Sequence, residues 1–424
     1  MLKKISVHQL RPGMFLHGLC CSWLDHPFWK TSFVIKGDEE IRKLLDSPVR
    51  EVWIDAAKGL DVAEFIDTAP APLAEPEPAS AQPAEPQVER ISLQLAPEPP
   101  QPVALTDEVA RAARLCRQAE GAVKDMFQDI RLGKAVDAEH CLPLVDEITS
   151  SVQRNPGAIV SLARLKTKDD YTYMHSVAVC ALMVALSRQL GLPEAETREA
   201  GLAGLLHDLG KAAMPLEVLN KPGKLTPDEY AIMRTHPAAG HAALVEGKGV
   251  GPIPLDVCLH HHERIDGKGY PHGLTGAQMT LHAKMGAVCD VYDAITSNRP
   301  YKAGWDPAES IQRMAQWARE GHFDEVVFQA FVKSIGIYPT GSLVKLESGR
   351  LGVVVEQNAG SLLEPLVRVF WSTRSNEPIP RQFVDLSVAG AKDRIVSREK
   401  PADWGFKNLD ELWGGDEAKA RLGG

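Results

Sequence analysis

The spacing of apolar residues changes along the chain and predicts three kinds of structure. From residue 105 to 337, apolar residues recur every three or four positions, as in TDEVARAARLCRQAEGAVKDMFQDIR, and this period predicts amphipathic helices. Before residue 67, the alternating stretches FVI and EVWID flank the helical pattern DEEIRKLLDS, which predicts a small α+β module. After residue 337, GSLVKLESGRLGVVVEQ and PLVRVFWS alternate β-forming residues around a Ser-Gly turn. We therefore expect a mainly α protein with a helical core and a short C-terminal β appendage.

A proline-rich segment separates the first module from the helical region. Residues 70–102 contain ten of the 30 prolines, interleaved with Ala, Glu and Gln. Such a composition cannot bury enough apolar surface to offset its chain entropy, so it predicts an extended, semi-rigid linker. The predicted domains are an N-terminal module (1–66), a linker (67–104), a helical domain (105–337) and a β-rich extension (338–424).

Composition and charge exclude several classes of protein. A net charge of -9 argues against general binding to nucleic acid, and 424 residues are too many for one ordinary core. The seven cysteines are scattered, which suits reduced thiols. The N-terminal stretch has no apolar signal region, and the longest uncharged apolar run, Val177 to Leu186, falls short of the roughly 18 residues of a membrane span. We expect a cytoplasmic protein without membrane insertion.

Nine of the fourteen histidines lie between His175 and His282, within the helical region. His175 shares a helical stripe with apolar residues and so points inward, although a single inward histidine is more often structural than a ligand. The stretch AGLAGLLHDLGKAAMP predicts a helix that ends at His207 and Asp208, with Gly210 as its C-terminal stop. Burying an imidazole and a carboxylate together costs several kcal/mol unless they are paired or bind a cation.

Further candidate ligands follow along the chain. They are His236 in MRTHPAAGH, His261 and His262 in LHHHERIDGKGYP, and Asp290 in AKMGAVCDVYDAITSNRPYK. Gly286, Asp290, Asp293 and Ala294 share one narrow helical face, so this helix can approach a neighbour closely while presenting its acid. Nitrogen and oxygen ligands without thiolate suit iron, manganese, nickel or zinc. Five histidines and two aspartates are too many for one ion, but suit two ions roughly 3.5 to 4 Å apart with a bridging carboxylate.

The order of the motifs HDLGK, LNKPGKLTPDEY, HHERIDGKGYPHGLTG and DVYDAITSNRPYK resembles the HD-GYP family over about residues 145–337. That family is a branch of the HD phosphohydrolases and hydrolyses cyclic di-GMP, so the resemblance implies an all-helical HD-type core. The opening stretch, with LRPGM and SWLDHPFW, resembles the small domain that often precedes it.

The resemblance implies roles for individual residues. The implied metal ligands are His175, His207, Asp208, His236, His261, His262 and Asp290. Asp208 would bridge the ions and act in catalysis together with Lys211. The implied substrate contacts are Lys211, Arg299, Lys302, Gly269 and Tyr270, where Tyr270 either stacks on a guanine or packs. A surface salt bridge is the competing interpretation for each basic residue.

Other polar residues near the motifs receive structural interpretations. His241, His260, His272 and His282 match no motif position, and Asp293 is expected to cap or orient its neighbours. Members of the family that have a three-metal site carry a glutamate four residues before the first histidine, where this chain has Tyr171. Asp169 and Asp170 are out of phase with His175. We therefore predict two metals, with phenolate binding to iron(III) as the minority alternative.

The implied chemistry is attack on phosphorus by a hydroxide that bridges two metals, iron or manganese first and nickel or zinc as alternatives. Cyclic di-GMP would give linear pGpG and, after a second cut, GMP. The alternatives are a non-catalytic cyclic di-GMP receptor or scaffold, and a hydrolase of another cyclic dinucleotide. The loop of residues 267–271, GKGYP, is called the GYP loop below. The family also suggests that this loop docks GGDEF-domain proteins. The N-terminal module could sense a signal or form a homodimer.

Overall fold

The computed structural model describes the chain as two compact units, Met1–Gln94 and Leu95–Gly424. The described residues are 2–19, 33–45, 51–60, 101–166, 171–297, 304–358, 360–388, 390–391 and 393–422. Most of the predicted linker lies outside them. The domain boundaries predicted from the sequence stay predictions.

The first unit is a small antiparallel sheet with one helix. Its strands are β1 (Leu2–Ser6), β2 (Phe15–Leu19), β3 (Phe33–Val34) and β4 (Glu51–Asp55), in the order β1-β4-β2-β3. Helix α1 (Asp38–Leu45) contributes Leu44 to a core that includes Met14, Leu16 and Ile54. The predicted α+β module is therefore present among the described residues.

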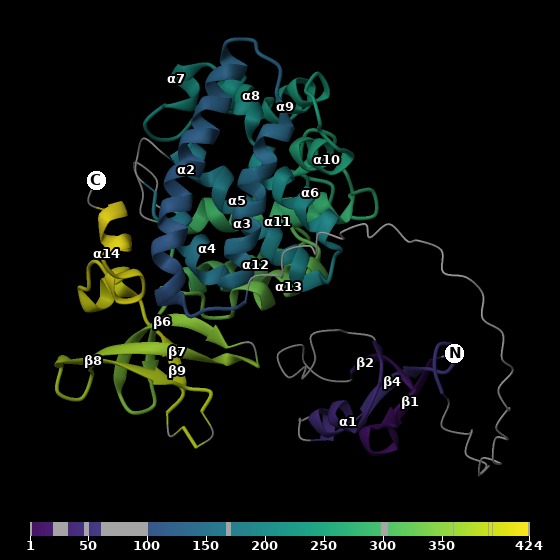
Figure 1. Ribbon diagram of the computed structural model, residues 1–424, viewed down its shortest axis with the longest axis vertical. Coiled ribbons are helices and arrows are strands. Elements are labelled where there is room, and N and C mark those ends of the chain that lie inside the picture. The colour runs from purple at the N-terminus through teal and green to yellow at the C-terminus, as the bar shows by residue number, and fades with distance from the viewer. Residues whose placement is uncertain are drawn as a thin grey trace, which may run out of the picture. The chain divides into compact units, whose positions relative to one another are not determined.

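The second unit is a helical bundle with a sheet at one end (Figure 1). Its helices are α2 (Leu105–Arg131), α3 (Leu142–Arg154), α4 (Pro156–Arg164), α5 (Tyr171–Leu190), α6 (Glu194–Leu206), α7 (Leu216–Leu219), α8 (Pro227–Met233), α9 (His236–Val245), α10 (Pro252–His260), α11 (Leu281–Thr296), α12 (Pro307–Arg319) and α13 (Glu325–Ile335). This architecture confirms the mainly α fold expected from the spacing of apolar residues.

Helix α5 lies in the middle of the bundle. It is long and apolar enough to cross a membrane by length and composition alone, but 78% of its most apolar window is buried inside the protein. It packs against α6, α4, α11 and α2. An apolar helix covered on all sides is typical of a protein core, and this burial explains the hydrophobic run from Val177 to Leu186.

The C-terminal sheet has five antiparallel strands in the order β8-β7-β6-β5-β9. They are β5 (Leu343–Leu346), β6 (Arg350–Asn358), β7 (Ser361–Ser372), β8 (Glu377–Asp385) and β9 (Ile395–Arg398). The turn between β5 and β6 contains Gly349 with a φ of 81°, a conformation that favours glycine. The predicted Ser-Gly turn is therefore at the expected place.

This sheet and the last helix, α14 (Glu411–Leu422), share a core with the helical bundle. Leu351 and Val353 of the sheet and Trp413 of α14 belong to the same buried cluster as Leu105, at the start of α2. The Asn155 side chain joins the parts further, because its amide donates to the Val103 carbonyl at 3.0 Å and to Glu356 Oε1 at 2.7 Å. The extension thus packs as part of the unit that carries the helices.

Candidate functional site

The seven predicted ligands come together at one place, although five different segments of the chain supply them. His175 lies in the first half of α5, and Asp290 lies in α11. His236 is the first residue of α9. The remaining four follow the ends of helices: His207 and Asp208 come directly after α6, and His261 and His262 come directly after α10. Helix ends therefore supply most of the cluster.

Gly210 has a different role from the helix stop expected from the sequence. Helix α6 ends at Leu206, and Gly210 lies in the following 3-10 turn, Leu209–Ala213. A Cβ atom at this position would come within 1.8 Å of the His236 carbonyl oxygen. The glycine is therefore required for close approach and not for a left-handed C-cap. It lets the segment that carries Asp208 lie directly against the start of α9, where His236 is located.

The ligand atoms form two neighbouring groups, and the carboxylate of Asp208 lies between them. His175, His207 and Asp208 make one group, and His236, His261 and His262 make the other, with the ligand atoms of each group within 4.8 Å of one another. Asp208 Oδ2 lies 3.4 Å from the Nε2 atoms of both His175 and His207. Asp208 Oδ1 lies 3.2 Å from His236 Nε2 and 3.8 Å from His261 Nε2. The two oxygens of one carboxylate thus face different groups.

Asp290 approaches the cluster from α11 in a similar manner. Its Oδ1 lies 3.0 Å from His175 Nε2 and 3.9 Å from His207 Nε2. Its Oδ2 lies 3.6 Å from His262 Nδ1. Asp290 therefore also spans both groups, a feature that the sequence did not indicate. Gly286, one turn earlier on α11, has Val257 of α10 at 2.8 Å from where its Cβ would be, which is the close helix approach expected from that face.

Four of the histidines are oriented by a hydrogen bond from Nδ1. His207 donates to the Gly204 carbonyl at 2.8 Å, His236 to Met233 at 2.7 Å, and His261 to Cys258 at 3.0 Å. His175 donates to Asp293 Oδ2 at 2.6 Å. A proton held on Nδ1 leaves the lone pair on Nε2, the atom that faces the cluster, and metal-binding histidines are usually oriented in this way.

Two buried atoms at the centre lack a hydrogen-bond partner among the described residues: His207 Nε2 and Asp208 Oδ1. Leaving such groups unpaired costs about 1–3 kcal/mol each. Both atoms point at neighbouring ligand atoms rather than at donors, so a cation would satisfy them. With five imidazoles and two carboxylates as donors, the residues present fit divalent transition metal ions.

The protonation states also suit metal binding. Burial lowers the pKa of His261 well below its ordinary value and that of His262 to about 3, so both rings are neutral at physiological pH. Burial alone would raise the pKa of Asp208, but Lys211 and His207 hold it well below the usual range. Burial alone would also raise the pKa of Asp290, but hydrogen bonding to His175 lowers it well below the usual range. Ionised carboxylates and neutral imidazoles are the forms that bind metal.

Asp293 lies behind the cluster and fixes His175. Besides His175, its carboxylate accepts hydrogen bonds from Lys166 and from the Ser297 hydroxyl, the latter at 3.1 Å. Lys166 is 4% exposed, and its ammonium also donates to Ser297 Oγ at 2.7 Å. Asp293 therefore orients its neighbours, as the sequence led us to expect. Lys166 was missed because a lysine in the polar run RLKTKDD looks like a solvated residue.

A cleft of about 810 Å³ opens over the cluster. His175, His262 and Asp290 line it, together with Lys211, whose ammonium lies 2.5 Å from Asp208 Oδ2. Residues of α2, of the start of α5 and of the segment 216–225 form its walls. The predicted contacts Arg299 and Lys302 lie outside the described residues. Of the predicted basic residues, Lys211 is the one that the described structure places at the cleft.

The GYP loop is held by a residue that the sequence analysis overlooked. Glu263 is 2% exposed, and its carboxylate accepts hydrogen bonds from the backbone amides of His272, Gly273 and Leu274 at 2.7 to 3.0 Å. Gly269 passes so close to Glu263 that a Cβ would lie 2.4 Å from its Cα. The loop therefore folds around Glu263. No periodicity marks this glutamate, and its position directly after His262 was the only available signal.

Tyr270 packs within the protein rather than standing free in the cleft. Its ring stacks on His262, with centroids 4.7 Å apart, and the Arg234 guanidinium lies 4.5 Å from its centroid. Of the two interpretations offered by the sequence, these contacts favour packing. Tyr171, the other tyrosine of interest, lies at the cleft with its ring parallel to that of His175, with centroids 6.2 Å apart.

Histidines without a motif role lie away from the ligand groups. His260 Nδ1 lies 2.8 Å from Asp256 Oδ1, and His260 Nε2 lies 3.1 Å from His272 Nδ1. His282 Nε2 lies 3.3 Å from Glu196. His241 lies in α9, outside both ligand groups. Their placement agrees with the structural interpretation.

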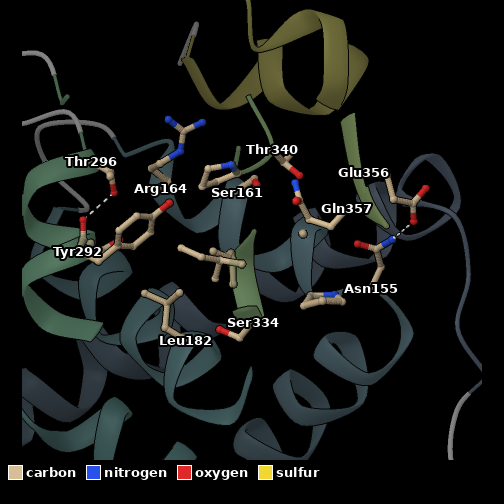
Figure 2. Close-up of a pocket in the computed structure, with 16 residues that line it drawn as sticks. Asn155, Ser161, Arg164, Leu182, Tyr292, Thr296, Ser334, Thr340, Glu356 and Gln357 are labelled. Carbon is tan, nitrogen blue, oxygen red and sulfur yellow. Dashed lines mark hydrogen bonds between the residues drawn. The ribbon is translucent and has the colours of Figure 1, made fainter. Parts of the chain in front are cut away.

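Asp293 also lines a second, smaller cavity. Figure 2 shows Arg164, Tyr292 and Gln357 around this cavity. It measures about 100 Å³ and is lined by residues of α4, α5, α11, α13 and β6. Tyr292, which is 3% exposed, and Arg164 border it. No predicted metal ligand lines it, and its volume is too small for a dinucleotide. The cleft over the histidine cluster is therefore the larger of the two and the one that predicted ligands line.

Comparison with known proteins agrees with this geometry. Residues 2–141 match a domain of unknown function, DUF3391, and residues 153–327 match the HD domain. A cyclic di-GMP phosphodiesterase of Pseudomonas aeruginosa is 56% identical over 416 residues, which cover 98% of this chain and 96% of the relative. The chain belongs to the HD-GYP family. This HD-GYP protein is accordingly a metal-dependent phosphodiesterase.

Two further relatives are similar to part of this HD-GYP protein. A cyclic di-GMP phosphodiesterase response regulator of Xanthomonas campestris pv. campestris is 48% identical over 124 residues, covering 28% of this chain and 32% of the relative. A 3'3'-cGAMP-specific phosphodiesterase of Vibrio cholerae is 36% identical over 181 residues, covering 42% of each. The family therefore includes enzymes named for different cyclic dinucleotides.

Proposed function

We propose that this HD-GYP protein hydrolyses cyclic di-GMP to linear pGpG and, by a second cut, to GMP. The observation that carries the proposal is the two-group cluster of five histidines and two aspartates at the floor of the 810 Å³ cleft. The relative from Pseudomonas aeruginosa, which is similar along almost its whole length, carries the name of this activity. Hydrolysis adds one water across a P–O3′ bond and leaves a 5′ phosphate and a free 3′ hydroxyl.

We propose that two divalent ions bind, one in each ligand group, with Asp208 between them. The opposed positions of its two carboxylate oxygens support this role. Asp290, which also reaches both groups, would be a second shared ligand. Iron or manganese are the metals we expect, with nickel or zinc as alternatives. When bound, such ions supply a water of lowered pKa as nucleophile and charge stabilisation for the phosphoryl group.

The chain's own side chains prepare the site for this chemistry. Asp293 keeps the Nδ1 proton of His175 in place, so that Nε2 stays available as a ligand. Lys211, 22% exposed beside Asp208, is positioned to contact a phosphoryl oxygen of a substrate in the cleft. We retain Arg299 and Lys302 as further substrate contacts. Gly269 and Tyr270 would act on substrate through the shape of the loop.

Two other functions compete with this proposal. The first is hydrolysis of 3'3'-cGAMP, for which the Vibrio cholerae relative is named. The second is a non-catalytic cyclic di-GMP receptor. A receptor has no need for two groups of buried ligand atoms joined by Asp208 and Asp290, so the geometry favours an enzyme. We further propose a cytoplasmic location, docking of GGDEF-domain proteins at the GYP loop, and a homodimer through the N-terminal unit.

The test is product chromatography after incubation of the reduced protein with manganese or iron and an equimolar mixture of cyclic di-GMP and 3'3'-cGAMP. We expect pGpG or GMP to form first. Faster loss of 3'3'-cGAMP would assign the enzyme to that substrate, and binding without turnover by any first-row metal would assign it as a receptor. The variants His261→Ala and His260→Ala serve as a matched pair. His261 faces the cluster, whereas His260 contacts Asp256 and serves as the control.

A further inference from the structure

One wall of the substrate cleft comes from α2, which precedes the HD domain match at residues 153–327. Lys124, Phe127 and Arg131 of this helix line the cleft together with His175, His262 and Asp290. Positions 124, 127 and 131 are spaced by three and four residues, so the three side chains lie on one face of the helix. Neither the HD domain nor the motifs of the chain assign a function to this face.

Phe127 anchors this part of α2. It is 3% exposed, and its ring packs edge-on against Tyr173 of α5 with centroids 5.5 Å apart. Val123, one turn earlier, is 1% exposed. The backbone between Lys124 and Arg131 is therefore fixed relative to α5, the helix that carries His175. Both basic side chains emerge from a rigid support on either side of the buried phenylalanine.

Lys124 and Arg131 are exposed and form no ion pair with any residue in the described part of the chain. Other cations on or just after the same helix differ in this respect. Arg117 lies 3.7 Å from Glu417, and Lys134 lies 2.7 Å from Asp129. Arg114 of the same helix also forms no ion pair among the described residues, but it does not line the cleft. Lys124 and Arg131 are thus the unpaired cations of α2 that face the cleft, which leaves their charge available to an anionic ligand.

A cyclic dinucleotide has two phosphodiesters, and only one can occupy the metal centre at a time. The other carries a full negative charge on the far side of the ring and must be accommodated within the same cleft. Lys124 and Arg131 are seven positions apart, about 10 Å along the helix axis. They therefore present two cations along the wall that α2 contributes to the cleft, and a phosphate between them would meet charge-assisted donors from both.

We propose that Lys124 and Arg131 form a subsite for the phosphodiester that is not being cut. This inference rests on the proposed function, because it takes the substrate to be a cyclic dinucleotide. The subsite binds the second negative charge of the substrate and so selects dianionic cyclic dinucleotides over simple phosphodiesters. In this way α2 contributes to specificity although it lies outside the HD domain.

The test compares the double variant Lys124→Ala, Arg131→Ala with the full-length wild-type protein on two substrates. Bis(p-nitrophenyl) phosphate has a single phosphodiester and reports on the metal centre alone. We expect the KM for cyclic di-GMP to rise about tenfold for each lost cation, the usual size of one charge-assisted contact. Turnover of bis(p-nitrophenyl) phosphate and bound metal should stay at wild-type values. The wild-type dependence of KM on salt concentration should become weaker in the variant.

Two control variants sharpen the comparison. Arg117→Ala removes a cation of α2 that does not line the cleft, and it should leave both substrates unaffected. The exchange Lys124→Arg, Arg131→Lys keeps both charges and should restore most of the affinity for cyclic di-GMP. An unchanged KM in the double alanine variant would overturn the subsite, as would equal losses on both substrates.

The outcome also separates this inference from the proposed function. A wild-type protein that cleaves bis(p-nitrophenyl) phosphate but neither cyclic di-GMP nor 3'3'-cGAMP refutes the proposed function and the subsite with it. A wild-type protein that cleaves a cyclic dinucleotide with a KM indifferent to both alanine substitutions refutes the subsite alone. A selective rise in KM for the cyclic dinucleotide supports both.

Discussion

Replacing Lys166 by Met tests how the protein supports its metal ligands from behind. The lysine side chain is 0% exposed and Asp293 is 3% exposed, so the pair has no water to replace a missing partner. Removing one member of a buried ion pair costs about 3–5 kcal/mol. Asp293 would keep its hydrogen bonds to His175 and Ser297, which places the expected loss near the lower end, at about 3 kcal/mol.

The assay is urea unfolding followed by circular dichroism in the presence of a chelator, so that metal binding does not contribute to stability. A parallel manganese titration measures affinity, which we expect to fall about 10- to 100-fold because His175 loses its firm orientation. Lys134→Met is the matched control, since its pair with Asp129 is solvent-exposed and contributes at most about 1 kcal/mol. A loss below about 1 kcal/mol for Lys166→Met, together with unchanged manganese affinity, would refute the reasoning.

Three further predictions concern the centre and its surroundings. Asp208→Ala should remove metal as well as activity, because the two ions would repel each other without the shared carboxylate; full occupancy by elemental analysis would reject the bridge. Glu263→Gln should destabilise the GYP loop against local opening by about 1–3 kcal/mol, because an NH₂ group would face backbone N–H donors. Hydrogen exchange at residues 269–274 measures this opening, and wild-type protection would contradict the prediction. Arg299→Ala or Lys302→Ala should raise the KM for cyclic di-GMP while metal content stays constant; unchanged kinetics in both would assign these residues to surface salt bridges.

The ligands could be predicted from the sequence because each lies in a motif whose residue types have few structural uses. A buried His-Asp pair or a run of histidines before a glycine-rich turn has no simple role in a helical core. Lys166 and Glu263 could not be predicted in the same way. Both are buried charged residues, and hydrophobic periodicity assigns charged residues to the surface unless the tertiary partner is known. Their partners lie 127 and about ten positions away, respectively.

The C-terminal region shows a second limit of periodicity. The strands β5, β6 and β7 followed from their alternating patterns, whereas β8 did not, because EPIPRQFVD contains two prolines. Proline is tolerated on an edge strand, and β8 is at the edge of the sheet. Alternation also shows that a strand has two faces without showing what covers them. For this reason the packing of Leu351 and Val353 against the helical core was not apparent from the sequence.

Leu105 and Trp413 belong to one core, and this affects how the chain folds while it is being synthesised. The two residues are separated by almost the entire unit, so contacts that complete the core form only after the last helix has been synthesised. At about 5–20 residues per second, the interval between them is roughly 15 to 60 s. During that time α14 does not yet cover the apolar face of α2. Chaperones bind exposed apolar surface of this kind on nascent chains. High contact order of this kind makes folding slow.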